Sequence, residues 1–220
     1  MANYRSVFDI IGPVMVGPSS SHTAGAVAIG NAARLIFQKT PKKVVVHYYE
    51  SFAKTHRGHG TDFAIAGGLL GMAPDDERIP KAPEMVAKAG IKLRFVEEEG
   101  PSPINHPNTA IIDLSDGEKQ ITVGGCSICG GTIEIRLIEL QGCKMNLTGP
   151  LPMVLYQSNE KNNPLVSQLN ELLDQEAGLQ KLQKWPVANG ELYEFDIEKY
   201  LAPDTLALMQ EKFKGIIYLK

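Results

Sequence analysis

A run of five polar residues, Ser19-Ser20-Ser21-His22-Thr23, follows two Gly-Pro pairs, Gly12-Pro13 and Gly17-Pro18. Because proline fixes φ and glycine leaves it free, such pairs predict bends rather than the interior of a helix or strand. The small apolar segment 24–37 comes directly after the polar run. It predicts a helix that packs tightly through its alanines and glycines.

The position of these hydroxyls, just ahead of a predicted helix, indicates two possible roles. A serine or threonine there is a helix N-cap signal, because its oxygen can accept a hydrogen bond from an unpaired backbone N–H. The exposed N–H groups and the helix dipole at such an end also favour a carboxylate or phosphate. We therefore expect a polar loop suited to hold a small anionic ligand, and a cap with no further role is the alternative.

A similar arrangement occurs between residues 51 and 70. The polar segment 51–62 holds His56 and His59, contains glycines, and runs into the Ala/Gly-rich segment 63–70. We expect a second polar loop followed by a helix, and two such loops can converge on one pocket. The alternative is that both histidines are solvated loop residues. Their spacing suits one face of a helical turn, but no partner pair has a zinc spacing.

The order of the remaining patterns predicts an α+β chain in two parts, 1–148 and 151–220, joined by a linker at 147–152. The first part adds a strand or helix at 4–11, a helix at 80–90, strands at 44–50, 91–97, 110–114 and 119–123, and a hairpin turn at 115–117. The second part reads strand 153–157, helix 164–176, strands 179–184 and 192–197, helix 203–214 and strand 216–219. This is the ferredoxin-like βαββαβ order.

Charge and hydropathy exclude several classes of function. The net charge of −3 gives no electrostatic footprint for nucleic acid. No apolar run approaches the ~20 residues that are needed to cross a bilayer. The N-terminus does not show a charged region followed by an apolar segment, so we expect no secretory signal, no membrane association and a cytoplasmic location.

The segment from Tyr4 to Gly25, with its Gly-Pro-Ser-Ser-Ser-His-Thr core, resembles the opening of the β subunit of iron–sulfur-dependent L-serine dehydratase, an L-serine ammonia-lyase. The resemblance extends to about residue 149 and includes Gly58-His59-Gly60-Thr61-Asp62 and His106-Pro107-Asn108-Thr109. It implies a serine-dehydratase β-type, allosteric-substrate-binding-like domain followed by a degenerate ACT-like ferredoxin-fold module. In that module Asn162-Asn163-Pro164-Leu165 replaces the usual glycine. This departure puts effector binding in doubt and leaves pairing with another sheet edge, as in a homodimer, open.

The resemblance also implies an activity, the α,β-elimination of water from L-serine to give pyruvate and ammonia. His22 and His59 are the implied catalytic residues, which position substrate or move protons, because imidazole titrates near neutral pH. The implied substrate-binding residues are Ser19, Ser20, Ser21, Thr23, Thr61, Asp62, His106, Asn108 and Thr109. There are two alternatives: a non-catalytic L-serine-binding regulatory module, and a scaffold that only closes its partner's active site.

Three cysteines, Cys126, Cys129 and Cys143, are in principle enough for a 4Fe-4S cluster with one open iron. Their spacing fits no bacterial ferredoxin pattern, and a redox Cys-x-x-Cys is expected at a helix start near a βαβ unit. By the resemblance, the 4Fe-4S cluster is bound by a separate α subunit, where the open iron acts as a Lewis acid. We therefore assign no metal ligand to this chain and expect it to be inactive without that partner.

Overall fold

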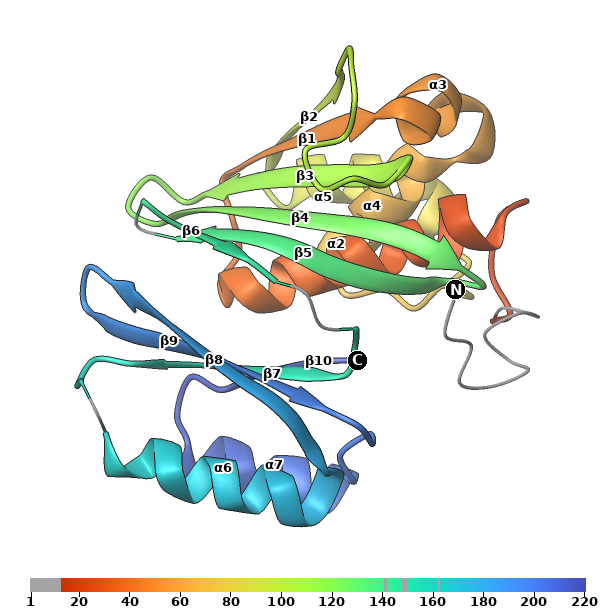
Figure 1. The fold of residues 1–220 in the computed structure, drawn as a ribbon. Coiled ribbons are helices and arrows are strands. Elements are labelled where there is room, and N and C mark those ends of the chain that lie inside the picture. Colours follow the sequence, from red (N-terminus) through yellow and green to blue (C-terminus); the bar gives the residue numbers. More distant parts are fainter. Residues whose placement is uncertain (1–12, 141, 148–149, 162) are drawn as a thin grey trace. The chain divides into compact units, whose positions relative to one another are not determined.

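The structure is a computed structural model that describes residues 13–140, 142–147, 150–161 and 163–220. The chain divides into two compact units, Met1–Glu139 with Asn146–Thr148, and Leu140–Met145 with Gly149–Lys220. Each unit contains a β-sheet with helices against one face, so the predicted α+β class is confirmed (Figure 1). The element predicted at 4–11 lies outside the described residues.

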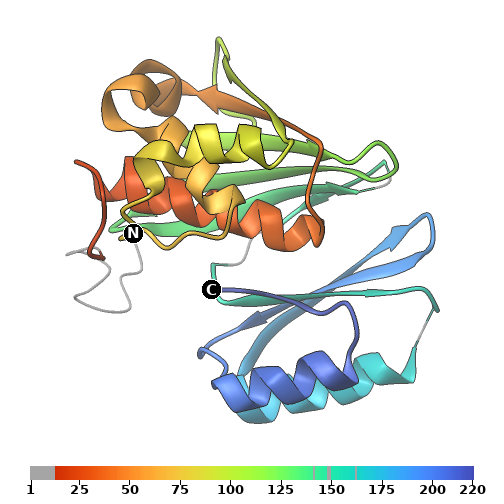
Figure 2. The same ribbon diagram turned by 180° about the vertical axis from the view of Figure 1, so that it is seen from behind.

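The first sheet has six strands in the order β2-β1-β3-β4-β5-β6. Strand β1 pairs parallel with β2 and antiparallel with β3, and β3 pairs antiparallel with β4. Helices α2, α4 and α5 cover one face of this sheet (Figure 2). The elements are a π-helix at Ser20–Ala24, α2 (Gly25–Phe37), β1 (Lys43–Tyr49), α3 (Glu50–His59), α4 (Thr61–Leu69), a 3-10 turn at Ile79–Lys81, α5 (Ala82–Lys88), β2 (Lys92–Glu97), β3 (Asn108–Ser115), β4 (Gln120–Cys129), β5 (Thr132–Leu140) and β6 (Cys143–Asn146).

Helices α2 and α4 pack backbone against backbone. A Cβ on Gly68 would lie 2.2 Å from the carbonyl oxygen of Val27, and one on Gly30 would lie 2.5 Å from that of Ile65. Real side-chain carbons do not approach oxygen so closely, so glycine alone fits at both positions. The tight small-residue packing predicted for the segment 24–37 is confirmed.

The prediction of polar loops before these helices was wrong in both places. Residues 51–62 form helix α3, which ends at Gly60 in the left-handed region with φ 72°, and α4 begins at the next residue. Here the glycine is a helix C-terminal signal rather than part of a loop. The first polar run forms a turn of π-helix, and the oxygen of Ser19 accepts a hydrogen bond from the His22 backbone N–H, which confirms the predicted cap.

Strand β4 is longer than its apolar pattern predicts. It continues through the glycine-rich segment to Cys129. A Cβ on Gly124 would lie 2.8 Å from Ile111 and one on Gly125 would lie 3.0 Å from Ile29. These glycines therefore allow close packing on the two faces of a strand, a known use of glycine in sheets.

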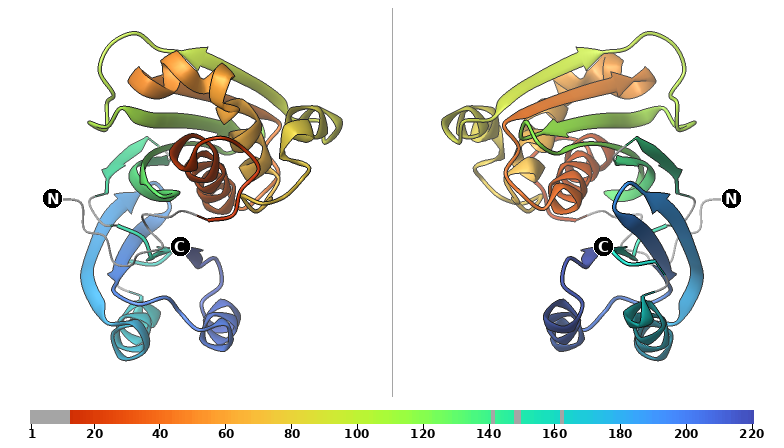
Figure 3. Two further views of the ribbon diagram at one scale, coloured as in Figure 1. Left: turned by 90° about the vertical axis from the view of Figure 1, so that its right-hand side faces the viewer. Right: turned by 90° about the vertical axis from the view of Figure 1, so that its left-hand side faces the viewer.

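The second unit has the predicted βαββαβ order, with an antiparallel four-stranded sheet in the order β10-β7-β9-β8. Helices α6 and α7 pack on one face of it (Figure 3). The elements are β7 (Met153–Ser158), α6 (Pro164–Ala177), β8 (Leu179–Val187), β9 (Gly190–Ile197), α7 (Pro203–Lys212) and β10 (Ile217–Leu219). Where an ACT-like module has its glycine, Asn163 caps α6 by accepting from the Leu165 N–H at 2.9 Å. The doubt about effector binding and the homodimeric pairing of an edge strand stay predictions.

Across the described ranges, every helix is too short or too polar to span a membrane.

Candidate active site

His22 lies in the π-helix with only 8% of its surface exposed. Its Nδ1 is 3.0 Å from the Ser21 hydroxyl and 3.3 Å from that of Ser19, while its Nε2 is 3.5 Å from the Ser51 hydroxyl on α3. Burial, and then the neighbouring His59, lowers the pKa of His22. Because both effects disfavour the imidazolium, His22 is a neutral ring that can accept a proton at physiological pH.

His59, the last residue of α3, stands edge-on to His22. Their ring centroids are 4.7 Å apart at an interplanar angle of 80°. The His59 Nδ1 is buried and has no hydrogen-bond partner among the described residues. Leaving such an atom unpaired is costly, so it marks a place where a ligand or a second chain would supply a partner. The two predicted clusters therefore meet at this histidine pair.

Buried hydroxyls accompany the two histidines. Thr23 and Thr61 are 1% and 0% exposed, and their hydroxyls have no hydrogen-bond partner in the described part of the chain. Ser127 on β4, which the sequence did not single out, shares both properties. It lies beneath the start of α2, because a Cβ on Gly25 would be 2.1 Å from its hydroxyl. Ser20 is half-buried.

The loop before β3 packs on the first turn of α3, where the Pro107 carbonyl accepts from the Ser51 N–H at 3.0 Å. The Asn108 amide donates to the Ser127 carbonyl at 3.3 Å, and the Asn108 N–H donates to the Nδ1 of His106 at 3.1 Å. Burial, and then the charge of Arg136, lowers the pKa of His106. His106 thus lies in the loop before β3 and Asn108 at the first position of β3, in a region that touches α3 and β4.

The Thr109 hydroxyl, on β3, is already occupied by residues of the loop before this strand. It donates to the His106 carbonyl at 2.6 Å and accepts from the Ser102 hydroxyl at 2.9 Å, and the residue is 0% exposed. Its contact with substrate stays a prediction that this geometry does not favour.

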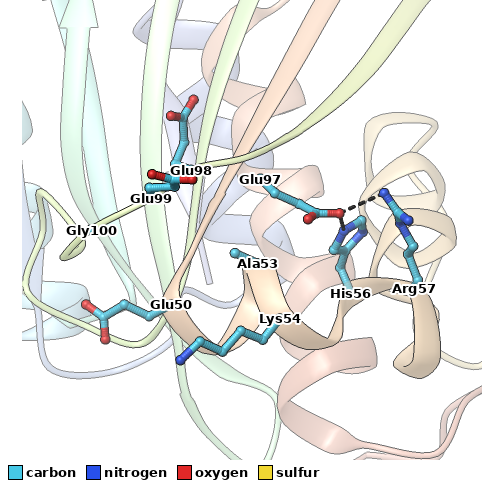
Figure 4. Close-up of a pocket in the computed structure, with 9 residues that line it drawn as sticks. All are labelled: Glu50, Ala53, Lys54, His56, Arg57, Glu97, Glu98, Glu99 and Gly100. Carbon is cyan, nitrogen blue, oxygen red and sulfur yellow. Dashed lines mark hydrogen bonds and ion pairs between the residues drawn. The ribbon is translucent and has the colours of Figure 1, made fainter.

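His56 is buried, so its interpretation as a solvated loop residue was wrong. Its Nδ1 lies 2.7 Å from Asp62 Oδ1. Its Nε2 lies 2.9 Å from Glu97 Oε1, which Arg57 also contacts (Figure 4). The histidine therefore ties α3 to α4 and β2. Asp62, predicted to bind substrate, is brought to His56 instead of to the His22–His59 pair.

Replacing His56 with alanine should lower the free energy of unfolding by about 2–3 kcal/mol, because a buried ring is lost together with its contacts to Asp62 and Glu97. Arg57→Ala is the matched control, since it removes the other contact of Glu97 from a side chain that is 80% exposed. We expect it to change stability by less than about 0.5 kcal/mol. Urea denaturation followed by circular dichroism measures both, and equal effects would contradict this role of His56.

A hollow of about 710 Å³ opens between α3 and the residues that follow β2 (Figure 4). It is lined by Glu50, Ala53, Lys54, His56, Arg57, Glu97, Glu98, Glu99 and Gly100. Neither His22 nor His59 lines it. The hollow and the predicted catalytic pair are therefore separate features of the first unit.

The cysteines do not fit an iron–sulfur cluster. Cys126 and Cys129 are three positions apart on β4, so their side chains point to opposite faces of the sheet. Burial raises the pKa of Cys126 to about 11, which opposes the thiolate that a metal requires. In the described ranges, no group of three His, Cys, Asp or Glu side chains is placed to hold a metal ion.

A family described as Serine dehydratase beta chain matches residues 6–100, which include both His22 and His59. The "Probable L-serine dehydratase, beta chain" of Bacillus subtilis (strain 168) is 48% identical over 169 residues, which cover 77% of this chain and 75% of that protein. This chain belongs to the serine dehydratase β-chain family. The expected family is thereby confirmed.

Further relatives differ in how much of their length they share with this chain. The "L-serine dehydratase, beta chain" of Peptoniphilus asaccharolyticus is 38% identical over 176 residues, covering 79% of this chain and 76% of that protein. The "L-serine dehydratase 2" of Escherichia coli (strain K12) is 36% identical over 108 residues, covering 46% of this chain and 23% of that protein. Most of the latter protein therefore lies outside the match.

Proposed function

We propose that this chain is the β subunit of an L-serine dehydratase that eliminates water from L-serine, giving aminoacrylate and then pyruvate and ammonia. The observation that carries the proposal is the meeting of His22 and His59, which come from separate elements, within the region matched by the family. His22 lies beside serine hydroxyls, and His59 carries a ring nitrogen that has no hydrogen-bond partner among the described residues.

The elimination needs a base for the α-proton and an acid for the departing hydroxyl. A buried neutral imidazole is suited to take a proton, which supports His22 as a candidate base. The unpaired Nδ1 of His59 gives a second position where a proton can be held. The unpaired hydroxyls of Thr23 and Thr61 are suited to donate to the substrate carboxylate.

We further propose that the 4Fe-4S cluster is bound by a separate α subunit. The naming of the relatives as beta chains supports a second subunit, and the Escherichia coli relative carries most of its length outside the matched region. The positions of the three cysteines of this chain also favour a cluster held elsewhere. The acid that activates the leaving hydroxyl is accordingly assigned to the partner.

The chain alone should form no pyruvate from L-serine, whereas the chain co-expressed anaerobically with its α subunit should do so and should leave D-serine unchanged. The physical reason is that the described residues offer candidate bases but no group of side chains placed to hold a metal that would activate the hydroxyl. A coupled assay for pyruvate measures both preparations. Activity of the isolated chain, or an assembled complex that binds L-serine without turning it over, would overturn the proposal, and the second result would indicate a regulatory module.

A further inference from the structure

The junction between β1 and α3 is strained. Glu50, the first residue of α3, has φ 45°, a left-handed backbone that side-chain-bearing residues rarely adopt. Its carboxylate accepts from the Ser102 N–H at 2.9 Å, and its backbone forms a bridge with Asn108. Strain of this kind persists only where neighbours hold it, and it concentrates at functional sites.

The strained turn places Ser51 against His22. The backbone N–H of Ser51 donates to the Pro107 carbonyl at 3.0 Å, and its own carbonyl accepts from the Thr55 hydroxyl at 2.6 Å. With its backbone N–H held by Pro107, Ser51 places its hydroxyl 3.5 Å from the Nε2 of His22. This is the outer limit of a hydrogen bond, and contacts in active sites commonly shorten when a ligand binds.

The groups around His22 differ from those around the other buried histidine. His56 lies between two carboxylates, so both of its ring nitrogens can donate. Each ring nitrogen of His22 faces serine hydroxyls instead, and a hydroxyl can either donate or accept. The titratable neighbour acting on His22 is His59 of α3, which also disfavours a charged ring. The surroundings of His22 are thus suited to a neutral imidazole.

We propose that Ser51 is a positioning residue for His22, with its hydroxyl donating to Nε2 while the Nδ1–H of His22 donates to Ser21. This arrangement satisfies both ring nitrogens and fixes the tautomer and orientation of the ring. Ser19 completes the chain of hydroxyls, because its oxygen lies 3.3 Å from that of Ser21. The Nε2 lone pair then accepts from Ser51 on the side of His22 that faces α3.

NMR of the histidine ring nitrogens in the full chain tests this arrangement without any need for turnover. In the native protein the ring of His22 should carry its proton on Nδ1. Ser51→Ala should raise the pKa of His22 by about half a unit, because the neutral form loses a hydrogen bond. Ser51→Thr should keep the native value, since it retains the hydroxyl.

Thr55→Ala is the matched control, because it removes a hydroxyl one turn along α3 that bonds to the backbone of Ser51. It should leave the pKa of His22 unchanged. An unchanged or lowered pKa in Ser51→Ala, or a native ring protonated on Nε2, would overturn the proposal. Equal shifts in the Ser51 and Thr55 variants would also overturn it, because they would indicate a general loosening of α3.

The catalytic consequence rests on the proposed function. In the assembled enzyme, Ser51→Ala should lower kcat by about tenfold with little change in KM, and Ser51→Thr should restore it. The acidic limb of the pH profile should move to higher pH, because a base of higher pKa is deprotonated later. An active enzyme with unchanged kcat would overturn the catalytic role. An assembly without L-serine activity but with the expected NMR shift would overturn the proposed function and leave the positioning of His22 supported.

Discussion

His59→Gln in the assembled dehydratase should lower kcat for L-serine by about 10²- to 10⁴-fold, the usual contribution of a positioned acid or base. The glutamine retains a polar side chain but has no nitrogen that exchanges a proton near neutral pH. The ring of His59 contacts that of His22, and its buried Nδ1 has no hydrogen-bond partner among the described residues. The substitution therefore removes a ring nitrogen that is available to a ligand. Steady-state production of pyruvate, with cluster content measured in parallel, gives the comparison.

His47→Gln is the matched control for this variant. His47 lies on β1 between Glu98 and Asp113, at 2.6 and 3.2 Å, and makes no ring contact with the His22–His59 pair. Its replacement should leave kcat within about twofold, since changes away from the site act mainly on stability. If His59→Gln retained native kcat but lost affinity for L-serine or cooperativity, the first unit would be a regulatory module rather than part of the catalytic machinery.

The meeting of His22 and His59 could be anticipated because both precede helices rich in small residues. Such helices pack closely, and this brings the ends that carry the polar residues together. The different role of His56 could not be anticipated from spacing. It lies on the same helix as His59, and its partner Glu97 is 41 residues away, at the end of β2. Only the parallel pairing of β1 with β2 brings that carboxylate to α3.

The roles of two serines could not be predicted from the sequence, for a related reason. Ser51 opens a segment that looks like a loop, and its importance depends on the left-handed backbone of Glu50. Ser127 lies between the two cysteines in a glycine-rich stretch that does not look like a strand, although β4 runs through it. The irregular backbone at Glu50 and the glycines of β4 both belong to regular elements that pack closely. A pattern of residue types cannot distinguish such positions from a loop.

The close packing of α2 against α4 predicts a large loss of stability for Gly68→Ala, about 3 kcal/mol, because overpacking at a closed interface forces the backbone to move. A Cβ at this position would lie 2.2 Å from the Val27 carbonyl oxygen and 2.9 Å from the Gly30 Cα. Both are backbone atoms of α2, so no side-chain rotation relieves the clash. Hydrogen exchange of α2 and α4 should therefore accelerate strongly, by a factor that reports the loss directly.

Gly58→Ala separates this effect from the general consequence of adding a methyl group to a helix. Gly58 lies in the last turn of α3, and a Cβ there would meet no atom within 4 Å. Alanine also has the higher helix propensity, so this variant should be unchanged or more stable by up to about 1 kcal/mol.

Trp185, the single tryptophan, lies on β8 of the second unit, so its fluorescence follows a part of the chain that neither substitution touches. Native-like hydrogen exchange of α2 and α4 in Gly68→Ala would mean that the two helices can separate at little cost. The close approach of their backbones would then not be what holds His22 and His59 together.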